Sequence, residues 1–296
     1  MMQVLSGSLV ALVTPMEKNG DVDFNALENL IEWHIHNGTD GIVSVGTTGE
    51  SATLEVDEHL DVIKHTVKCV NGRIPVIAGS GSNSTAQAIE TTKESYKIGA
   101  DYSLLVTPYY NKPSQRGLIE HYTKIANSSD MKLILYNVPS RTSCDLLPET
   151  VEILAKHKNI IGIKEAVNKK ERISNLINIS NKNNEEFLIF SGDDESFLNL
   201  LESGGHGVIS VAANIVPNII SQICNKFKEN PDEAFKLNKK YKNLYKLLFI
   251  ESNPVPVKWM LYKTGLIQDS IRLPLLTLNK KYQENIALEM LKLELL

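Results

Sequence analysis

The chain has 296 residues, 42% of them hydrophobic and 22% charged, so it can bury a large core and differs from disordered and fibrous proteins. Its 35 acidic and 31 basic side chains give a net charge of −4, which argues against nucleic-acid binding because no broad basic face is available. Cys69, Cys144 and Cys224 lie far apart, which indicates reduced, buried thiols, and without a signal-peptide or membrane-spanning pattern we expect a cytoplasmic protein with no membrane contact.

Short runs rich in Val, Ile and Leu alternate along the chain with segments of helical period. The predicted strands are Ser8–Val13, Ile42–Val45, Pro75–Ala78, Tyr102–Val106, Lys132–Tyr136, Ile160–Lys164, Phe187–Phe190 and Gly207–Val211. Helices are predicted to begin near Asn25, Asp57, Ser84, Ser114, Pro148, Lys169, Glu195 and Pro217. Parallel strands need helical crossovers, and eight such repeats favour an α/β fold, the closed (β/α)8 TIM barrel.

Three further helices are predicted after the last strand, over Pro231–Ile250, Val255–Thr264 and Lys281–Leu295. We therefore divide the chain into a (β/α)8 catalytic barrel over 1–224 and a C-terminal helical extension over 225–296. The lysine-rich stretch Lys236–Lys246 also carries an apolar stripe, so it indicates a solvated helix rather than a nucleic-acid contact.

The strongest chemical signal lies on the predicted sixth strand, because the active sites of such barrels form at the C-terminal ends of the strands. Side chains alternate along a strand, so Gly162 and Lys164 are expected to point into the barrel. A lysine there is either paired with an inward carboxylate or kept neutral to attack a ketone, and this strand alone favours neither. The neighbouring strand places Tyr136 beside it, as a proton relay or as a core residue.

Two loops at the same end carry weaker signals. The Gly-Thr-Thr-Gly-Glu turn at 46–50 frees backbone N–H groups that suit a substrate carboxylate, although such turns often bind nothing. Tyr109 and Tyr110 lie on a proline-braced loop that suits a subunit contact, a substrate wall or packing under the loop. Asp193 and Asp194 are adjacent at a strand end and point to opposite sides, so we interpret them as caps of the next helix.

The histidine spacing predicts no metal site. His34 and His36 are two residues apart on a predicted helix and face different directions. His59 and His65 are six apart and do not share a face well. We therefore expect no metal ligand set.

Five motifs occur in order along the chain: Gly-Thr-Thr-Gly-Glu (46–50), Pro-Tyr-Tyr (108–110), Tyr-Asn-Val-Pro-Ser-Arg-Thr (136–142), Gly-Ile-Lys-Glu-Ala (162–166) and Gly-Gly-His-Gly-Val-Ile-Ser-Val (204–211). In sequence, order and spacing they closely resemble the dihydrodipicolinate synthases, also called 4-hydroxy-tetrahydrodipicolinate synthases. The resemblance spans essentially the whole chain. It implies a lyase of lysine and diaminopimelate biosynthesis that condenses pyruvate with L-aspartate 4-semialdehyde through a lysine Schiff base, without metal or organic cofactor. It also implies a homotetramer built as a dimer of dimers.

The resemblance implies a role for each matching catalytic position. Lys164 matches the Schiff-base lysine and Tyr136 the proton-relay tyrosine. Thr48 and the partner subunit's Tyr110 complete that relay.

Substrate contacts follow in the same way. Thr47 and Thr48 lie in the implied site, and Arg141 matches the arginine that holds the carboxylate of the second substrate, a role that suits a planar guanidinium. Gly192 and Ile209 match positions whose backbones line the pyruvate pocket.

The resemblance also implies a lysine feedback pocket, whose matching positions are Ser51, Ala52, Leu54, His59, Asn83 and Tyr109. Two positions depart from the inhibited enzymes, because Val56 replaces a histidine and Gln87 replaces a glutamate that faces the lysine ammonium. We therefore expect weakened or absent inhibition by lysine.

Two other hypotheses compete. A sibling aldolase, such as N-acetylneuraminate lyase or a 2-keto-3-deoxysugar aldolase, would share Lys164 and Tyr136 but would need hydroxyl partners where this chain has Arg141. A catalytically silent barrel that serves as a binding or regulatory subunit would have lost Lys164, Tyr136 or one of the paired threonines, and all are present.

Overall fold

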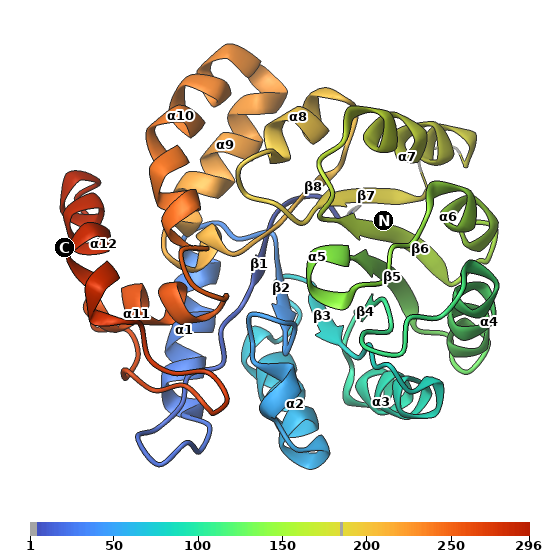
Figure 1. Cartoon of the computed structure of the whole chain (residues 1–296), viewed down its shortest axis with the longest axis horizontal. Helices are drawn as coiled ribbons and strands as arrows, with labels where there is room; N and C mark the ends of the chain where they lie inside the picture. The colour runs from blue at the N-terminus through green and yellow to red at the C-terminus, as the bar shows by residue number, and fades with distance from the viewer. Residues whose placement is uncertain (1–4, 184–185) are drawn as a thin grey trace. The chain divides into compact units, whose positions relative to one another are not determined.

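The computed structural model describes residues 5–183 and 186–296, and its strands and helices alternate along the chain (Figure 1). The strands form a closed barrel in the order β1 to β8, and the paired neighbours run parallel, so the fold is the predicted TIM barrel. Their bounds are β1 Gly7–Ala11, β2 Gly41–Ser44, β3 Val76–Gly79, β4 Tyr102–Val106, β5 Lys132–Asn137, β6 Ile160–Glu165, β7 Leu188–Ser191 and β8 Gly207–Ser210.

The helices begin close to their predicted starts. Those up to β8 are α1 Phe24–His36, α2 Val56–Val70, α3 Thr85–Ile98, α4 Gln115–Ala126, α5 Pro139–Thr142, α6 Pro148–Leu154, α7 Lys170–Lys182 and α8 Phe197–Glu202. After it come α9 Pro217–Glu229, α10 Pro231–Leu247, α11 Val255–Lys263 and α12 Lys280–Lys292, with short 3₁₀ turns η1 Ser51–Thr53 and η2 Ala212–Asn214. No helix in the described ranges is long and apolar enough to cross a membrane.

Side-chain caps explain several helix starts. Asp23, Ser84, Ser114 and Asn230 each accept a hydrogen bond from a backbone N–H in the first turn of the helix that follows. The short helix α5 was not predicted, because four residues are too few to show a helical period. Helix α9 runs through the predicted domain boundary after residue 224, and that division stays a prediction.

Backbone contacts group the chain into two compact units. The first contains Pro75–Ile209, and its strands β4 to β7 pair side by side; Ile134, Ile163 and Ile189 on these strands are fully buried.

A register shift between β5 and β6 decides which side chains face each other in this unit. Leu133 pairs with Ile160, whereas Ile134 pairs with Gly162, so Ile161 is an extra residue on β6. The shift places Lys164 opposite Tyr136. Without it, Ile163 would occupy that place and the lysine would be displaced by one residue.

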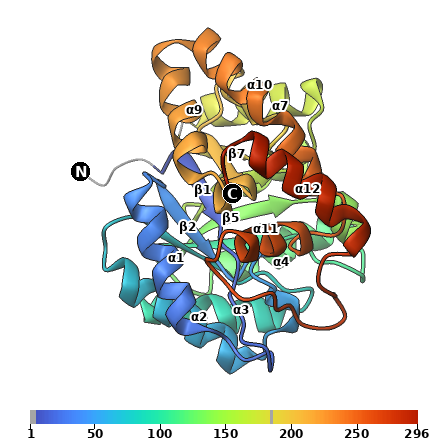
Figure 2. The ribbon, with the colours of Figure 1, turned by 90° about the vertical axis from the view of Figure 1, so that its left-hand side faces the viewer.

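The second unit contains Gly7–Ile74 and Ser210–Leu296. Strands β1 and β2 pair within it, helices α1 and α2 pack together, and α10 packs against α9 and α12 (Figure 2). The Asn214 amide accepts a hydrogen bond from the Val13 N–H at 3.1 Å and donates one to the Ala11 carbonyl at 2.8 Å. These bonds fix the end of β1 against the segment after β8.

Candidate active site

Lys164 lies near the end of β6 with 5% of its surface exposed. Its Nζ lies 4.5 Å from the centre of the Tyr136 ring, the residue opposite it on β5. Burial lowers the pKa of Lys164 to about 8; the Asp194 carboxylate opposes this change and the Arg141 guanidinium adds to it. A substantial fraction of this amine is therefore neutral at neutral to mildly basic pH, which is the form that attacks a carbonyl.

The backbone beside the lysine is open because Gly192 follows β7. A Cβ at this position would lie 3.0 Å from the Lys164 Cε and 3.2 Å from the Ala166 Cβ. A larger residue would press on the lysine side chain, so glycine keeps space free next to the amine. Ile209, the other predicted backbone position, is 1% exposed on β8.

Arg141 is presented by the short helix α5, directly after β5. Pro139 opens this helix, and Ser143, with a φ of 55°, ends it in the left-handed region. The Thr107 hydroxyl donates to the Thr142 Oγ1 at 3.1 Å, which ties the end of β4 to the helix. The Arg141 side chain is exposed, so it can meet a carboxylate that arrives from solvent.

A polar network, buried except for Asp145, supports the strand ends that carry these groups. The Asn137 amide donates to both Glu165 carboxylate oxygens at 3.1 Å and to the Asp145 Oδ1 at 2.9 Å. The Arg172 guanidinium donates to Glu165 at 3.1 Å and to Asp145 at 2.6 Å. Burial raises the pKa of Glu165 to about 7, and Arg172 opposes that rise. The network fixes β5 against β6 one residue beyond the Tyr136–Lys164 pair.

The Gly-Thr-Thr-Gly-Glu turn follows β2 in the second unit. Val45 and Glu50 have φ values of 50° and 57°, and this region is unfavourable for a β-branched valine, so the turn is held in a strained conformation. A Cβ at Gly49 would lie 2.9 Å from the Val45 Cα, so only glycine fits there. The Thr14 hydroxyl donates to the Gly49 carbonyl at 2.7 Å.

Residues of the C-terminal segment hold this turn. The Asn253 amide donates to the Thr48 Oγ1 at 2.9 Å, and both residues are buried. The Lys258 ammonium on α11 lies 2.5 Å from the Glu50 Oε1, and the Arg272 backbone N–H donates to Glu50 Oε2 at 3.1 Å. Burial lowers the pKa of Lys258, and the Glu50 carboxylate opposes that change. The turn that carries Thr47 and Thr48 is therefore anchored by the helical extension.

The loop after β4 carries the two predicted tyrosines. Tyr110 is 88% exposed and Tyr109 is 41% exposed. Tyr110 has a φ of 73°, which is rare for a residue with a side chain. The Asn83 amide donates to the Tyr109 carbonyl at 3.2 Å, and the Asn111 amide donates to the Asn83 carbonyl at 2.9 Å. These bonds hold the loop in a conformation that leaves the large aromatic ring of Tyr110 in solvent.

Comparison with known proteins places the chain in a family. The model of the Dihydrodipicolinate synthetase family matches residues 4–292. The chain belongs to this family. The 4-hydroxy-tetrahydrodipicolinate synthase of Shewanella piezotolerans is 50% identical over 291 residues, which is 98% of each protein.

Solved structures of family members share the whole fold. The chloride-inhibited dihydrodipicolinate synthase of Acinetobacter baumannii, complexed with pyruvate, is 47% identical with a TM-score of 0.95 and covers 99% of this chain and 100% of its own. The Cyanidioschyzon merolae enzyme with lysine bound is 38% identical with a TM-score of 0.95 and covers 99% of each chain. The family resemblance inferred from the motifs is confirmed.

One prediction about this family member was wrong. Asp193 and Asp194 do not cap helix α8, which begins at Phe197, because its N-cap residue is Ser196 and no side chain caps the helix. Asp193 instead accepts a hydrogen bond from the Ser196 hydroxyl. Asp194 is 2% exposed, and its negative charge raises the pKa of Lys164, against the larger effect of burial.

The residues of the predicted lysine pocket lie in both units. In the second unit, Ser51 and Ala52 lie on η1, Leu54 follows η1, and Val56 and His59 lie on the first turn of α2. Asn83, Gln87 and Tyr109 lie in the first unit. In the first unit, Asn83 contacts Tyr109 as described, and the Ser82 hydroxyl donates to the Gln87 Oε1 at 3.3 Å.

Motif reasoning missed several residues that support the site. Asn137 and Glu165 belong to the family motifs at 136–142 and 162–166, but the sequence does not show that they face each other until the strand register is known. Asn253 and Lys258 lie some two hundred positions after their partners in the sequence and belong to no quoted motif. Only a contact map or the structure could have found them.

Proposed function

We propose that this family member is a 4-hydroxy-tetrahydrodipicolinate synthase, a lyase that condenses pyruvate with L-aspartate 4-semialdehyde through a Schiff base on Lys164. The observation that carries the proposal is a buried lysine whose pKa is lowered to about 8 and whose Nζ faces a tyrosine ring at 4.5 Å. The pyruvate complex of the Acinetobacter baumannii relative supports the choice of first substrate.

The lowered pKa changes how much reactive amine is present. A lysine with an ordinary pKa of about 10.4 is neutral in about one molecule in a thousand at pH 7.5. With a pKa of about 8, roughly one Lys164 side chain in four is neutral at that pH. Burial therefore raises the concentration of the nucleophile by about two orders of magnitude.

The reaction begins when the Lys164 Nζ lone pair attacks the ketone carbon of pyruvate. The ketone oxygen takes up a proton to give a carbinolamine, the nitrogen loses one, and departure of the protonated hydroxyl as water leaves the imine. Loss of a methyl proton then gives an enamine, whose carbon attacks the aldehyde carbon of the second substrate while the aldehyde oxygen takes up a proton. Attack on the resulting imine carbon by water, or by the amino group of the bound product, breaks the bond to Nζ and frees Lys164. The Tyr136 hydroxyl is the proton relay that we assign to these steps, since its ring lies beside the amine.

We assign the remaining relay positions to Thr48 and the partner subunit's Tyr110. The Asn253 amide donates to the Thr48 Oγ1, so the hydroxyl proton of Thr48 is left to be donated elsewhere. The exposed ring of Tyr110 supports assembly into a homotetramer built as a dimer of dimers, in which this residue would act on the neighbouring site.

Arg141 would bind the carboxylate of the semialdehyde, because its guanidinium is exposed on a short helix that is separated from β5 by a single residue. Thr47, Thr48, Gly192 and Ile209 would line the pyruvate side of the site. No metal or organic cofactor is needed for this chemistry. A cytoplasmic location is proposed as well, in keeping with cysteines that are free thiols.

The activity is tested with the purified chain and two substrate sets. With pyruvate and L-aspartate 4-semialdehyde we expect a condensation product that mass spectrometry identifies. With N-acetylneuraminate or a 2-keto-3-deoxysugar acid we expect no release of pyruvate. Cleavage of a sugar acid without condensation of the semialdehyde would establish the sibling aldolase instead, and inactivity with every substrate would favour a binding or regulatory subunit.

A further inference from the structure

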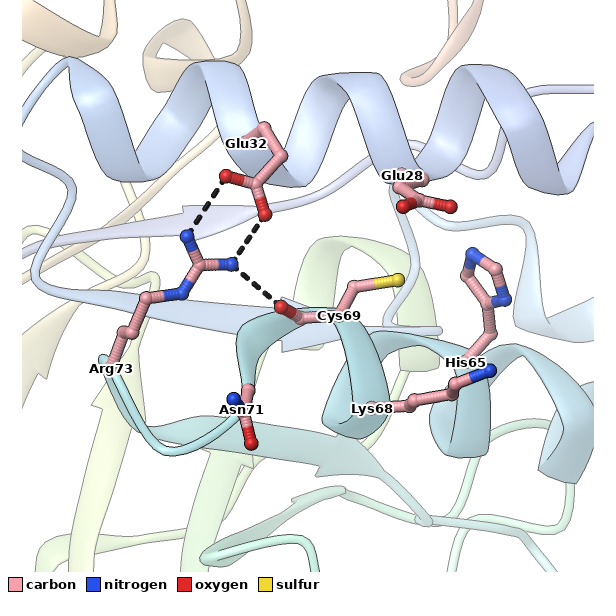
Figure 3. A pocket seen from close by; sticks show the side chains of 7 residues that line it. All are labelled: Glu28, Glu32, His65, Lys68, Cys69, Asn71 and Arg73. Carbon is pink, nitrogen blue, oxygen red and sulfur yellow. Dashed lines mark hydrogen bonds and ion pairs between the residues drawn. The ribbon is translucent and has the colours of Figure 1, made fainter.

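A second cluster of reactive side chains lies between helices α1 and α2 in the second unit (Figure 3). Glu28 extends from α1, while His65 and Cys69 are four residues apart on α2 and share one face of that helix. One ligand atom from each residue lies within 4.8 Å of the other two. None of the three belongs to the catalytic groups described above.

Two observations indicate that this cluster is open to a ligand. The His65 Nε2 is buried and has no hydrogen-bond partner within the described residues, an arrangement that costs free energy unless something binds it. The cluster also borders a cavity of 260 Å³, whose other lining residues are Glu32, Lys68, Asn71 and Arg73.

The neighbouring charges leave Glu28 available. The Arg73 guanidinium binds Glu32 through both of its terminal nitrogens and donates to the Cys69 carbonyl at 2.6 Å (Figure 3). Arg73 is thereby paired with Glu32 and not with Glu28.

The Cys69 thiol is protonated before a cation binds. Burial, together with the charges of Glu28 and Glu32, raises the pKa of this thiol, and the charges of Lys68 and Arg73 oppose the rise. Cys69 must therefore release its proton when it binds a cation.

We propose that Glu28, His65 and Cys69 bind one borderline-soft divalent cation, with Zn²⁺ as the best match, and so link α1 to α2. A carboxylate oxygen, an imidazole nitrogen and a thiolate sulfur form a typical zinc donor set, whereas Ca²⁺ and Mg²⁺ need oxygen ligands. Ligand atoms around tetrahedral zinc are roughly 3.3–3.8 Å apart. Small side-chain rotations would bring the three ligand atoms, which lie within 4.8 Å of one another, to that separation. Water completes the coordination, and the bound ion stabilises the helix pair.

Cobalt provides the direct test, because Co²⁺ replaces Zn²⁺ and gives an absorption band when a thiolate binds it. The metal-free full-length protein is titrated with Co²⁺. We expect about one equivalent to bind with a near-ultraviolet charge-transfer band, and Zn²⁺ to displace it. Cys69→Ser should abolish the band. Glu28→Gln should weaken binding by about tenfold or more, whereas the matched control Glu120→Gln, which removes the same charge from an exposed position on α4, should bind like the unchanged protein.

Thiol protection gives a second readout that needs no variant. The prediction of buried thiols is confirmed for Cys144 and Cys224, which are 4% and 2% exposed, but it was wrong for Cys69, which is only partly buried. Cys69 is therefore the cysteine expected to react first with an alkylating reagent in the native protein. Zn²⁺ should slow that reaction and raise the Tm. A charge-transfer band that survives Cys69→Ser, an equal loss of affinity in Glu120→Gln, or an alkylation rate unchanged by Zn²⁺ would overturn the proposal and indicate adventitious binding only.

Discussion

Replacing Lys258 by Met breaks the buried ion pair that ties α11 to the turn after β2. The Lys258 and Glu50 side chains are 4% and 1% exposed, and their charged atoms lie 2.5 Å apart. The Arg272 backbone N–H, which donates to Glu50 at 3.1 Å, is not altered by the substitution, but the neutralising charge of Lys258 is lost. Removing one partner of a buried pair destabilises a protein by about 3–5 kcal/mol, since the other charge stays in a poorly solvating interior.

The prediction is measured by urea denaturation of Lys258→Met, Glu50→Gln and the double variant. We expect Lys258→Met to lose about 3–5 kcal/mol and the double variant to recover most of that loss, because a neutral amide replaces the unpaired carboxylate. Lys263→Met is the matched control: this lysine lies on the same helix but is exposed, so its loss should stay within about 0.5 kcal/mol.

The same variants report on the site. A loosened turn displaces Thr48, so kcat should fall in Lys258→Met and recover in part in the double variant. A loss below about 1 kcal/mol in Lys258→Met, or a double variant whose loss equals the sum of the two single losses, would refute the assignment of this pair as the anchor of the turn.

Three further predictions concern the chemistry. Imine formation with pyruvate should rise with pH through a midpoint near 8, because burial lowers the pKa of Lys164; a midpoint near the ordinary value of about 10.4 would contradict this. Arg141→Leu should lower kcat/KM for the semialdehyde by about one to two decades while imine formation stays nearly unchanged, and equal damage to both steps would assign Arg141 to the whole site. Free lysine should inhibit initial rates at least about tenfold more weakly than in enzymes with a glutamate at the position of Gln87, or not at all, since an amide carries no charge and Val56 offers no imidazole; submillimolar half-inhibition would disprove it.

The barrel could be predicted because its strands and helices leave local signals. Runs of Val, Ile and Leu mark the strands, and Pro148, Pro217 and Pro231 open helices where expected. The inward direction of Lys164 also follows from simple alternation near the end of one strand.

The remaining features depend on contacts between distant parts of the chain. The extra residue Ile161 lies in an apolar run that gives no sign of a register shift, yet this shift sets Lys164 opposite Tyr136. Gly162 is needed there because a Cβ would lie 2.5 Å from the Leu188 carbonyl oxygen, a restriction that exists only once β6 and β7 are paired. Likewise, the spacing between histidines gave no sign of the cluster of Glu28, His65 and Cys69, because two of its members are not histidines and Glu28 lies on a different helix.

Trapping the intermediate on Lys164 tests the central claim most directly. The protein is incubated with pyruvate, reduced with borohydride and digested, and the modified peptide is located by mass spectrometry. Lys258 serves as an internal control, because it is equally buried but paired with Glu50. We predict one reduced pyruvate adduct, on Lys164, and its absence without pyruvate. An adduct on Lys258 or another lysine, or no adduct under conditions that trap a known imine enzyme, would contradict the mechanism.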